Sequence, residues 1–287
     1  MLTIGPYRLF SVSTSGFRLD GGAMFGVVPK TLWGKKEPAD EYNRIEMGLN
    51  ALLLQDTHRN ILVDTGVGAK MSPKLCKIYA IDHSKTELIR SLKRIGLYPG
   101  DITDVILTHL HFDHAGGATC YQDGEIVPTF PNATYYIQKG QWELGNAASD
   151  KDRASFFPEN FIPLKEHGQL EIVEGSFELF PHLHLIEVNG HTVSQQLVKV
   201  SDDKTTLLNC GDMIPLAAHI SIPWVAAYDL YPLISIQEKK KYLAQAVDET
   251  WLLMFEHDVT CGVLGTIKYG TRGYQVDQIY SFDFFNF

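Results

Sequence analysis

Residues 108–117 read THLHFDHAGG, and this stretch decides the fold of the chain. It places three histidines and one aspartate within six positions: His109, His111, Asp113 and His114. Alternate side chains of an extended segment point the same way, so the first two histidines can reach one ion. The chain must turn after Phe112, and adjacent ligands on a turn suit a second ion. The stretch therefore predicts a metal site at the end of a strand, where the two glycines give the backbone room.

Further ligands are expected, because one zinc takes three or four protein ligands and two ions take more. Four other stretches have the form of an apolar strand followed by a ligand-type residue in a polar loop: Asp64 after NILV, His191 after LIEVNG, Asp212 after TTLLNCG and His257 after LLMFE. Ligands delivered from the ends of several strands are held by a rigid scaffold. We therefore expect these residues to share one site with the cluster.

Hydrophobic periodicity predicts strands and helices in both halves of the chain. Residues 50–66 predict strand, turn and strand. Residues 82–97 predict a helix with Ser84 and Glu87 as a capping box, Gly96 as its stop and an apolar face of Leu88, Leu92 and Ile95. Residues 235–251 predict a second helix, with Ser235 and Glu238 as its capping box. This mixture indicates a layered α/β domain, and because no linker is visible we expect one domain over residues 1–287.

Composition narrows the function classes. The 287 residues are 45% hydrophobic and 21% charged, with a formal net charge of −9, which argues against a nucleic-acid partner. The four cysteines show no paired spacing and predict free thiols in a reducing compartment. The start of the chain does not resemble a signal peptide, and no apolar run is long enough to span a bilayer. We therefore expect a cytoplasmic protein with no membrane partner.

The run HLHFDHAGG, with LVDTG before it and NGHTVSQ, NCGD and FEHD after it, resembles the metallo-β-lactamase superfamily in motif content and order. The resemblance extends from about Asp64 to His257, and the H-x-H-x-D-H core is highly specific. Within the superfamily the motifs are most similar to the N-acyl-homoserine-lactone lactonases and the organophosphate-hydrolase-like branch. The resemblance implies an α/β fold, a four-layer αββα sandwich, holding two divalent metal ions. Zinc is the first expectation, with iron, manganese or cobalt as alternatives.

The same resemblance implies a role for each ligand-type residue. The first metal would be bound by His109, His111 and His191, the second by Asp113, His114 and His257, and Asp212 would bridge both. Asp64 would orient a ligand histidine or, alternatively, only stabilise its own turn. A hydroxide between the ions would attack a small ester-like substrate, with Asp113 moving the proton.

The lactonase resemblance has one gap. Those enzymes place a tyrosine three residues after the bridging aspartate, where it polarises the lactone carbonyl, and here that position is Pro215. Tyr228 or Tyr231, in WVAAYDLYPL, is expected to take its place from another loop.

Two other stretches are candidates for substrate binding. Met24, Phe25 and Trp33 are expected either to wall an apolar substrate pocket or to form an ordinary hairpin with core aromatics. His219, in PLAAHISIPW, is expected either to face the substrate or to lie in the core or on the surface.

The leading interpretation is a dinuclear metal-dependent hydrolase that cleaves a small lactone. An arylesterase or phosphotriesterase using the same site is the first alternative, and an iron-dependent redox enzyme of the persulfide dioxygenase kind is the second. A binding protein without catalysis is disfavoured by the intact ligand set. A flavodiiron-type site is disfavoured because His111 is present where that site has an acid. The sequence leaves a homodimer open.

Overall fold

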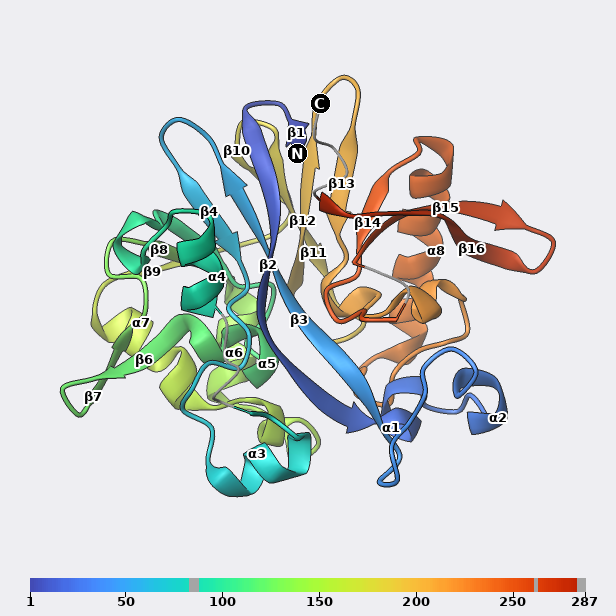
Figure 1. Ribbon diagram of the computed structural model, residues 1–287, viewed down its shortest axis with the longest axis horizontal. Coiled ribbons are helices and arrows are strands. Elements are labelled where there is room, and N and C mark those ends of the chain that lie inside the picture. The colour runs from blue at the N-terminus through green and yellow to red at the C-terminus, as the bar shows by residue number, and fades with distance from the viewer. Residues whose placement is uncertain (83–87, 261–262, 283–287) are drawn as a thin grey trace. The chain divides into compact units, whose positions relative to one another are not determined.

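The computed structural model describes residues 1–82, 88–260 and 263–282, which form two compact units (Figure 1). Unit 1 comprises Met1–Gly5, Phe17–Gly48 and Ser176–Phe287, and unit 2 comprises Pro6–Gly16 and Leu49–Gly175. The single domain expected from the sequence stays a prediction.

One seven-stranded sheet has the order β1-β2-β3-β4-β5-β8-β9, and its strands β4, β5, β8 and β9, with parts of β2 and β3, belong to unit 2, whereas β1 belongs to unit 1. Its strands are β1 (Leu2–Ile4), β2 (Tyr7–Asp20), β3 (Arg44–Gln55), β4 (Asn60–Val63), β5 (Asp104–Ile106), β8 (Thr134–Gln138) and β9 (Leu170–Val173). A separate hairpin contains β6 (Thr119–Gln122) and β7 (Glu125–Pro128). The strand, turn and strand predicted over residues 50–66 are confirmed, because β3 and β4 pair antiparallel from Leu52 opposite Val63 to Gln55 opposite Asn60.

Short helices follow the strands of unit 2. They are α3 (Pro73–Tyr79), α4 (Leu88–Arg94), α5 (Phe112–Ala115), α6 (Lys139–Asn146) and α7 (Ile162–Glu166), with 3₁₀ turns η2 (Pro99–Asp101), η3 (Gly116–Ala118), η4 (Arg153–Ser155) and η5 (Pro158–Asn160). Leu92 of α4 and Leu164 of α7 are buried in one core cluster with Val105 and Tyr135 of the sheet. Helices therefore cover one face of this sheet.

The helix predicted over residues 82–97 is confirmed in its second half. Leu88 and Leu92 are buried, and Gly96 has the positive φ of 83° that suits a stop. Ile95 is 37% exposed, so the predicted apolar face is wrong at that position, because the helix ends at Arg94. The predicted capping box of Ser84 and Glu87 lies outside the described residues.

A second seven-stranded sheet carries unit 1, in the order β10-β11-β12-β13-β14-β15-β16. Its strands are β10 (Phe177–Phe180), β11 (Leu183–Val188), β12 (Gln195–Ser201), β13 (Thr206–Asn209), β14 (Leu252–Met254), β15 (Leu264–Gly270) and β16 (Gly273–Tyr280). The unit also contains α1 (Gly21–Phe25), α2 (Lys30–Trp33), η6 (Gly211–Met213), η7 (Ala217–Ile220) and α8 (Pro232–Asp248).

The long helix α8 covers this second sheet, and Figure 1 shows it beside β15. Tyr242, Leu243 and Ala246 of α8 are buried in one cluster with Leu208 and Leu253 of the sheet. The mixed α/β class predicted from the sequence is confirmed, with sheet and helix present in each unit. Among the described residues no helix is long and apolar enough to cross a bilayer.

Aromatic side chains fill the core beside α1. The Phe25 ring stacks on Trp33 at 5.3 Å and on His219 at 4.8 Å, and it meets the edge of Trp224 at 5.5 Å. Phe25 is 0% exposed and Trp33 is 1% exposed. Gly21 is required beneath this stack, because a Cβ there would lie 2.3 Å from the Trp33 ring. Phe25 and Trp33 therefore pack as core aromatics, but they do so from the helices α1 and α2, so the hairpin expected for this stretch is wrong.

We predict that Phe25→Ala lowers the free energy of unfolding by about 3–5 kcal/mol, because the change leaves a cavity among three rings. Val27→Ala is the control, since Val27 is 93% exposed and its truncation should change stability by less than about 0.5 kcal/mol. Urea unfolding followed by circular dichroism measures both. Equal stability of the two variants would contradict the packing role of Phe25.

A buried carboxyl lies after α2. Glu37 is 2% exposed, and its Oε2 accepts a hydrogen bond from the Thr260 hydroxyl at 2.7 Å. Burial raises the pKa of Glu37 to about 7, against the opposing effect of the Thr260 hydroxyl and with the help of the negative charge of Asp258. The folded chain therefore keeps a proton on Glu37 at pH values where the unfolded chain has lost it.

We predict that Glu37 weakens the fold as pH rises. Folding raises the pKa of Glu37, so protonated Glu37 stabilises the folded state relative to ionised Glu37. This stabilisation is fully present below the unfolded pKa of 4.5 and is lost as pH rises to about 7. Glu37→Gln does not titrate, so its stability relative to wild type should increase between about pH 5 and about pH 8. The exposed Glu41→Gln is the matched control and should show no such change. Urea midpoints at the two pH values measure the difference.

Candidate metal centre

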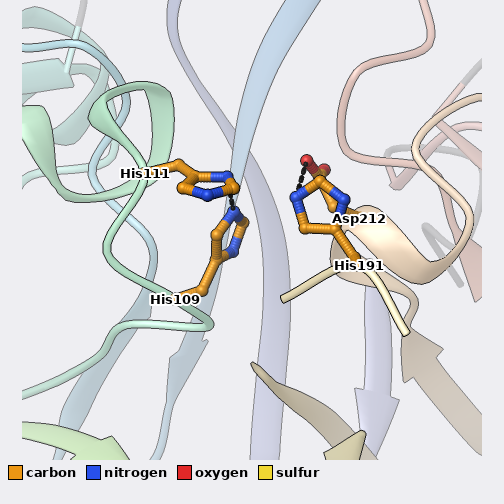
Figure 2. Close-up of side chains that lie close together, drawn as sticks. All are labelled: His109, His111, His191 and Asp212. Carbon is orange, nitrogen blue, oxygen red and sulfur yellow. Dashed lines mark hydrogen bonds and ion pairs between the residues drawn. The ribbon is translucent and has the colours of Figure 1, made fainter. Parts of the chain in front are cut away.

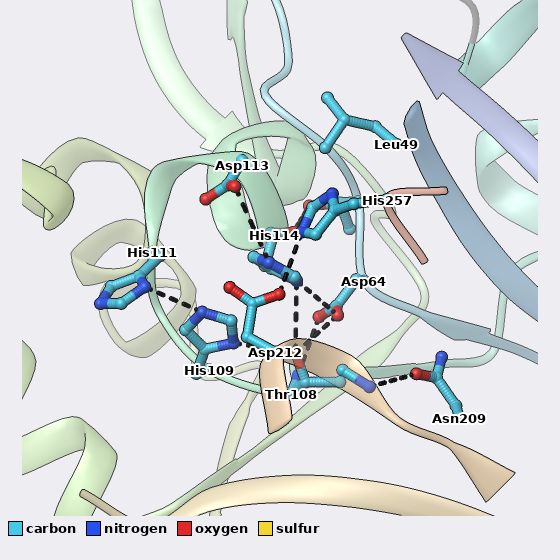
Figure 3. Close-up of polar contacts among 12 residues, drawn as sticks. Leu49, Asp64, Thr108, His109, His111, Asp113, His114, Asn209, Asp212 and His257 are labelled. Carbon is cyan, nitrogen blue, oxygen red and sulfur yellow. Dashed lines mark hydrogen bonds and ion pairs between the residues drawn. The ribbon is translucent and has the colours of Figure 1, made fainter. Parts of the chain in front are cut away.

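In unit 2 the ligand-type side chains follow the carboxyl ends of two parallel strands. β4 and β5 pair with Val63 opposite Ile106, so the chain leaves both strands at the same edge of the sheet. Asp64 there has a φ of 61°, a left-handed conformation that aspartate tolerates better than most residues. Its Oδ1 accepts from the Thr108 amide at 2.8 Å and its Oδ2 from the Thr108 hydroxyl at 2.6 Å (Figure 3).

Asp64 also fixes His114. The Asp64 Oδ2 lies 2.9 Å from the His114 Nδ1, and both side chains are 0% exposed. A carboxylate accepts hydrogen bonds, so the hydrogen of this imidazole belongs on Nδ1 and the lone pair on Nε2. The predicted contact between Asp64 and a cluster histidine is present, and Asp64 also forms the turn that was its alternative role. The His114 Nε2 lies 3.9 Å from an oxygen of Asp113.

Asp64 reaches a second histidine through Thr108. The Thr108 hydroxyl donates to Asp64, so its oxygen can accept from the His109 Nδ1 at 3.1 Å. This leaves the His109 Nε2 with a lone pair, and it lies 2.9 Å from the His111 Nδ1 (Figure 2). Two imidazole nitrogens from one strand end therefore converge on one point, as two ligands of one ion would.

Glycines allow this loop to pack. A Cβ on Gly116 would lie 2.3 Å from the Val67 carbonyl oxygen, and one on Gly117 would lie 2.3 Å from the Thr65 carbonyl oxygen. Backbone therefore touches backbone directly after the cluster. The sequence-based expectation that these two glycines give the chain room is confirmed, and the reason is close approach.

In unit 1 three strands deliver the other ligand-type residues. β11 and β13 are each antiparallel to β12, and β13 is parallel to β14, so β11, β13 and β14 all run in one direction. Their carboxyl ends meet at one edge of the sheet. His191 follows β11, Asp212 follows β13 and His257 follows β14. These three residues therefore lie at strand ends as expected, and their role as metal ligands stays a prediction.

The Asp212 carboxylate faces both histidines of unit 1. Its Oδ2 lies 3.2 Å from the His191 Nε2, and its Oδ1 lies 3.0 Å from the His257 Nε2 (Figures 2 and 3). The His257 Nδ1 donates to the carbonyl oxygen of Gly48 at 2.8 Å, which can only accept. With a hydrogen on Nδ1, the His257 Nε2 can offer its lone pair beside the Asp212 oxygen, and a divalent cation suits that pair of donors.

Asp229 holds His191, and sequence reasoning missed it. Its Oδ1 lies 3.0 Å from the His191 Nδ1, and its Oδ2 accepts from the Ser235 hydroxyl at 2.6 Å. The amides of Leu230 and Tyr231 donate to the carbonyl oxygens of His191 and Gly190. The segment AYDLYP therefore anchors the loop that carries His191. The sequence did contain one signal for Asp229, because this aspartate lies between Tyr228 and Tyr231, the two tyrosines expected to face the substrate.

The helix predicted over residues 235–251 is α8, but its predicted capping box is wrong. The helix begins at Pro232, so Ser235 and Glu238 lie inside it. Glu238 accepts hydrogen bonds from the amides of Asn189 and Gly190 at 2.7 and 3.0 Å. Both side chains are therefore used to hold the His191 loop.

The tyrosines differ in their surroundings. Tyr228 and Tyr231 are 37% and 47% exposed, on either side of Asp229. At the missing lactonase position, the carbonyl oxygen of Pro215 accepts from the His257 amide. Tyr79, at the end of α3, stacks on Phe112 at 4.9 Å. Burial and then the negative charge of Asp113 raise the pKa of Tyr79, so this phenol keeps its proton near the cluster.

His219 uses its Nε2 for its hydrogen bond to the protein, whereas His114, His191 and His257 use their Nδ1. Its Nε2 donates to the Met24 carbonyl oxygen at 2.8 Å, and burial lowers its pKa to about 4. The ring is 2% exposed and stacks on Phe25. The structure therefore favours the core position, one of the two expectations for His219. Met24 is also buried, at 3% exposure.

Each unit thus gathers its own His and Asp group, from side chains that can hold a metal ion. Unit 2 gathers His109, His111, Asp113 and His114 around Asp64 and Thr108. Unit 1 gathers His191, Asp212 and His257, with Asp229 and the Gly48 carbonyl behind them. Every sequence-predicted ligand belongs to one of the two groups.

Comparisons with known proteins place these residues within a family of metal-dependent enzymes. The profile of the metallo-beta-lactamase superfamily matches residues 46–257. The chain is 25% identical to an N-acyl homoserine lactonase of Bacillus cereus over 244 residues, 76% of this chain and 84% of that protein. It is 28% identical to the N-acyl homoserine lactonase AiiB of Agrobacterium fabrum over 265 residues, 88% of this chain and 93% of that protein.

Solved structures show the same fold. A probable metal-dependent hydrolase from Staphylococcus aureus is 30% identical, with a TM-score of 0.88 over 96% of this chain and 97% of that one. The dizinc quorum-quenching lactonase AidC is 22% identical, with a TM-score of 0.79 over 97% and 96% of the two chains. The matched profile includes every His and Asp of the two groups, so the chain belongs to the metallo-β-lactamase superfamily and is a metal-dependent hydrolase.

Proposed function

We propose that the chain is a dinuclear metallohydrolase that opens small lactones. The proposal assigns the two groups to one centre with seven ligands: His109, His111, Asp113, His114, His191, Asp212 and His257. Seven ligands are too many for one tetrahedral zinc. Membership of the superfamily supports their joint use, and both curated relatives named above are N-acyl homoserine lactonases.

One observation carries the dinuclear assignment. The Asp212 carboxylate presents its two oxygens to two different histidine Nε2 atoms, at 3.2 and 3.0 Å. Both imidazoles have their Nδ1 against another acceptor, which is Asp229 for one and Gly48 for the other. Such a carboxylate could bind one metal ion beside each histidine, one through each oxygen, and this is what a bridging ligand does. Zinc is the proposed metal because histidine and carboxylate ligands suit it.

The reaction follows from this arrangement. Two adjacent divalent ions supply a strong oxygen nucleophile at neutral pH and polarise the carbonyl under attack. Asp113 would take up the nucleophile's proton and return it to the leaving alkoxide. Tyr79 would donate its phenolic hydrogen to the substrate carbonyl oxygen, taking the place of the tyrosine that Pro215 replaces. The raised pKa of Tyr79 supports this role, because only the protonated phenol can donate.

We predict two metal ions per chain, counted by plasma emission on protein purified without chelator. Asp212→Ala should lose metal and lower kcat/KM for a lactone by about a hundredfold or more. Asp229→Asn should keep the fold but weaken metal binding by roughly ten- to a hundredfold, because it changes the partner of the His191 Nδ1. Asp203→Asn, on the surface, is the control. One ion per chain with full activity would refute the dinuclear proposal.

We predict that Tyr79→Phe lowers kcat for a lactone by about a hundredfold, since one hydrogen bond to the developing oxyanion is lost. Tyr228→Phe and Tyr231→Phe, at exposed positions, should each change kcat by less than about threefold. Metal content and circular dichroism should match wild type in all three variants. A large loss only in Tyr228→Phe or Tyr231→Phe would return the phenol to that loop, and three unchanged variants would show that no tyrosine serves.

A further inference from the structure

A hollow of ≈ 780 Å³ opens on unit 1, and none of the ligand-type residues of the candidate metal centre lines its described walls. The walls come from α2 and the residues after it, from η7 and the loop that follows, and from β16, which packs on η7. Small-molecule sites typically measure about 300–1,000 Å³. The hollow therefore has room for a small ligand.

The walls of the hollow are largely apolar. Ile220 is 2% exposed, and Trp224 and Val276 are partly buried beside it. Two apolar side chains at the opening remain in contact with water, because Leu32 is 51% exposed and Ile279 is 44% exposed. A ligand with an apolar chain would remove these surfaces from water.

Three cations complete the lining. Lys35, Lys36 and Arg272 are exposed, and none of them forms an ion pair with a described residue. The lining contains no described Asp or Glu. This concentration of positive charge lies on a chain whose formal net charge is −9. An anion is therefore attracted to this hollow and repelled by the protein as a whole.

The wall that carries Trp224 is fixed before any ligand arrives. The Lys239 Nζ, from α8, donates to the carbonyl oxygens of Ser221, Ile222 and Trp224 at 2.8, 3.2 and 2.7 Å. Lys239 is 1% exposed. The Trp224 ring also meets Phe25 edge-on. A wall held in this way loses little conformational entropy on binding.

We propose that this hollow binds an amphipathic carboxylate, a fatty-acid-like molecule with its chain against Ile220, Trp224 and Val276 and its carboxylate among Lys35, Lys36 and Arg272. Apolar walls with an unpaired cationic rim match both ends of such a molecule. The site is additional to the proposed metal centre and does not depend on it.

The test titrates decanoate, kept below its critical micelle concentration, into the metal-loaded full chain. Calorimetry should show one saturable site per chain, and tryptophan fluorescence should change with it. Trp224→Phe should abolish the fluorescence change and keep the calorimetric binding. Across hexanoate, octanoate and decanoate, each added methylene should tighten binding by roughly two- to fourfold. Uncharged 1-decanol should bind at least about tenfold more weakly than decanoate.

A matched pair of double variants locates the carboxylate. Lys35→Ala/Lys36→Ala should weaken decanoate binding by about tenfold or more, because two of the three cations are removed. Lys74→Ala/Lys240→Ala removes the same charge from exposed positions outside the hollow and should change binding by less than about twofold. Unchanged thermal unfolding in both variants shows that the fold is intact.

Five results would overturn the proposal. No saturable decanoate binding refutes it, and so does equal weakening in the two double variants. Binding that survives Lys35→Ala/Lys36→Ala but is displaced by excess phosphate would place the carboxylate at the metals. If phosphatidylglycerol vesicles bind and monomeric decanoate does not, the occupant is a membrane surface. A concentration-dependent doubling of mass, lost in Lys35→Ala/Lys36→Ala, would show that a second copy of the chain covers the hollow.

Discussion

A hydrogen bond from the Nδ1 of a buried histidine to a fixed acceptor is the interaction on which the candidate metal centre depends. His114 uses Asp64, His191 uses Asp229 and His257 uses the Gly48 carbonyl. Each acceptor decides which nitrogen carries hydrogen, and it also fixes the rotation of the ring. Without it a neutral imidazole could present an N–H where a ligand must present a lone pair. Within each of the two groups, the orientation of these imidazoles is therefore set by the acceptor behind the ring.

Helix α8 supplies part of the support for His191. Its first turns provide Ser235 and Glu238, which bind Asp229 and the amides of Asn189 and Gly190. Gly190 can lie this close to the helix because it has no side chain, whereas a Cβ at that position would lie 2.4 Å from the backbone nitrogen of Ser235. The helix thus packs on the sheet by its apolar face and fixes the His191 loop by its first turns. One element supplies both stability and the position of a ligand.

The sequence predicted the strands and singled out the ligand-type residues because both are local patterns. Short apolar runs marked β3 and β4, and each ligand-type residue lies in the loop after such a run. The partners of the ligands were not predictable in this way. Asp229 is 38 residues from His191, and Gly48 is 209 residues from His257. A backbone carbonyl leaves no trace in residue identity, and a lone aspartate in a loop resembles any turn former.

The wrong capping box has the same origin. Ser235 and Glu238 have the spacing that caps a helix, but Pro232 already occupies the first helical turn, where its fixed φ suits a start. The pattern of serine and glutamate three residues apart therefore had two physical readings. Only the position of the His191 loop, which comes from β11 far earlier in the chain, selects the second one.

His219 shows how the same residue type serves a different purpose when the other nitrogen is used. Its Nε2 hydrogen binds the Met24 carbonyl, and burial keeps the ring neutral throughout the physiological range. A neutral ring can stack face to face on Phe25 without carrying a charge into the core. His219 therefore behaves as an aromatic core residue that ties α1 to the loop after Asp212. Changes at Phe25 or Trp33 would therefore alter the packing of His219 and of the loop that carries it.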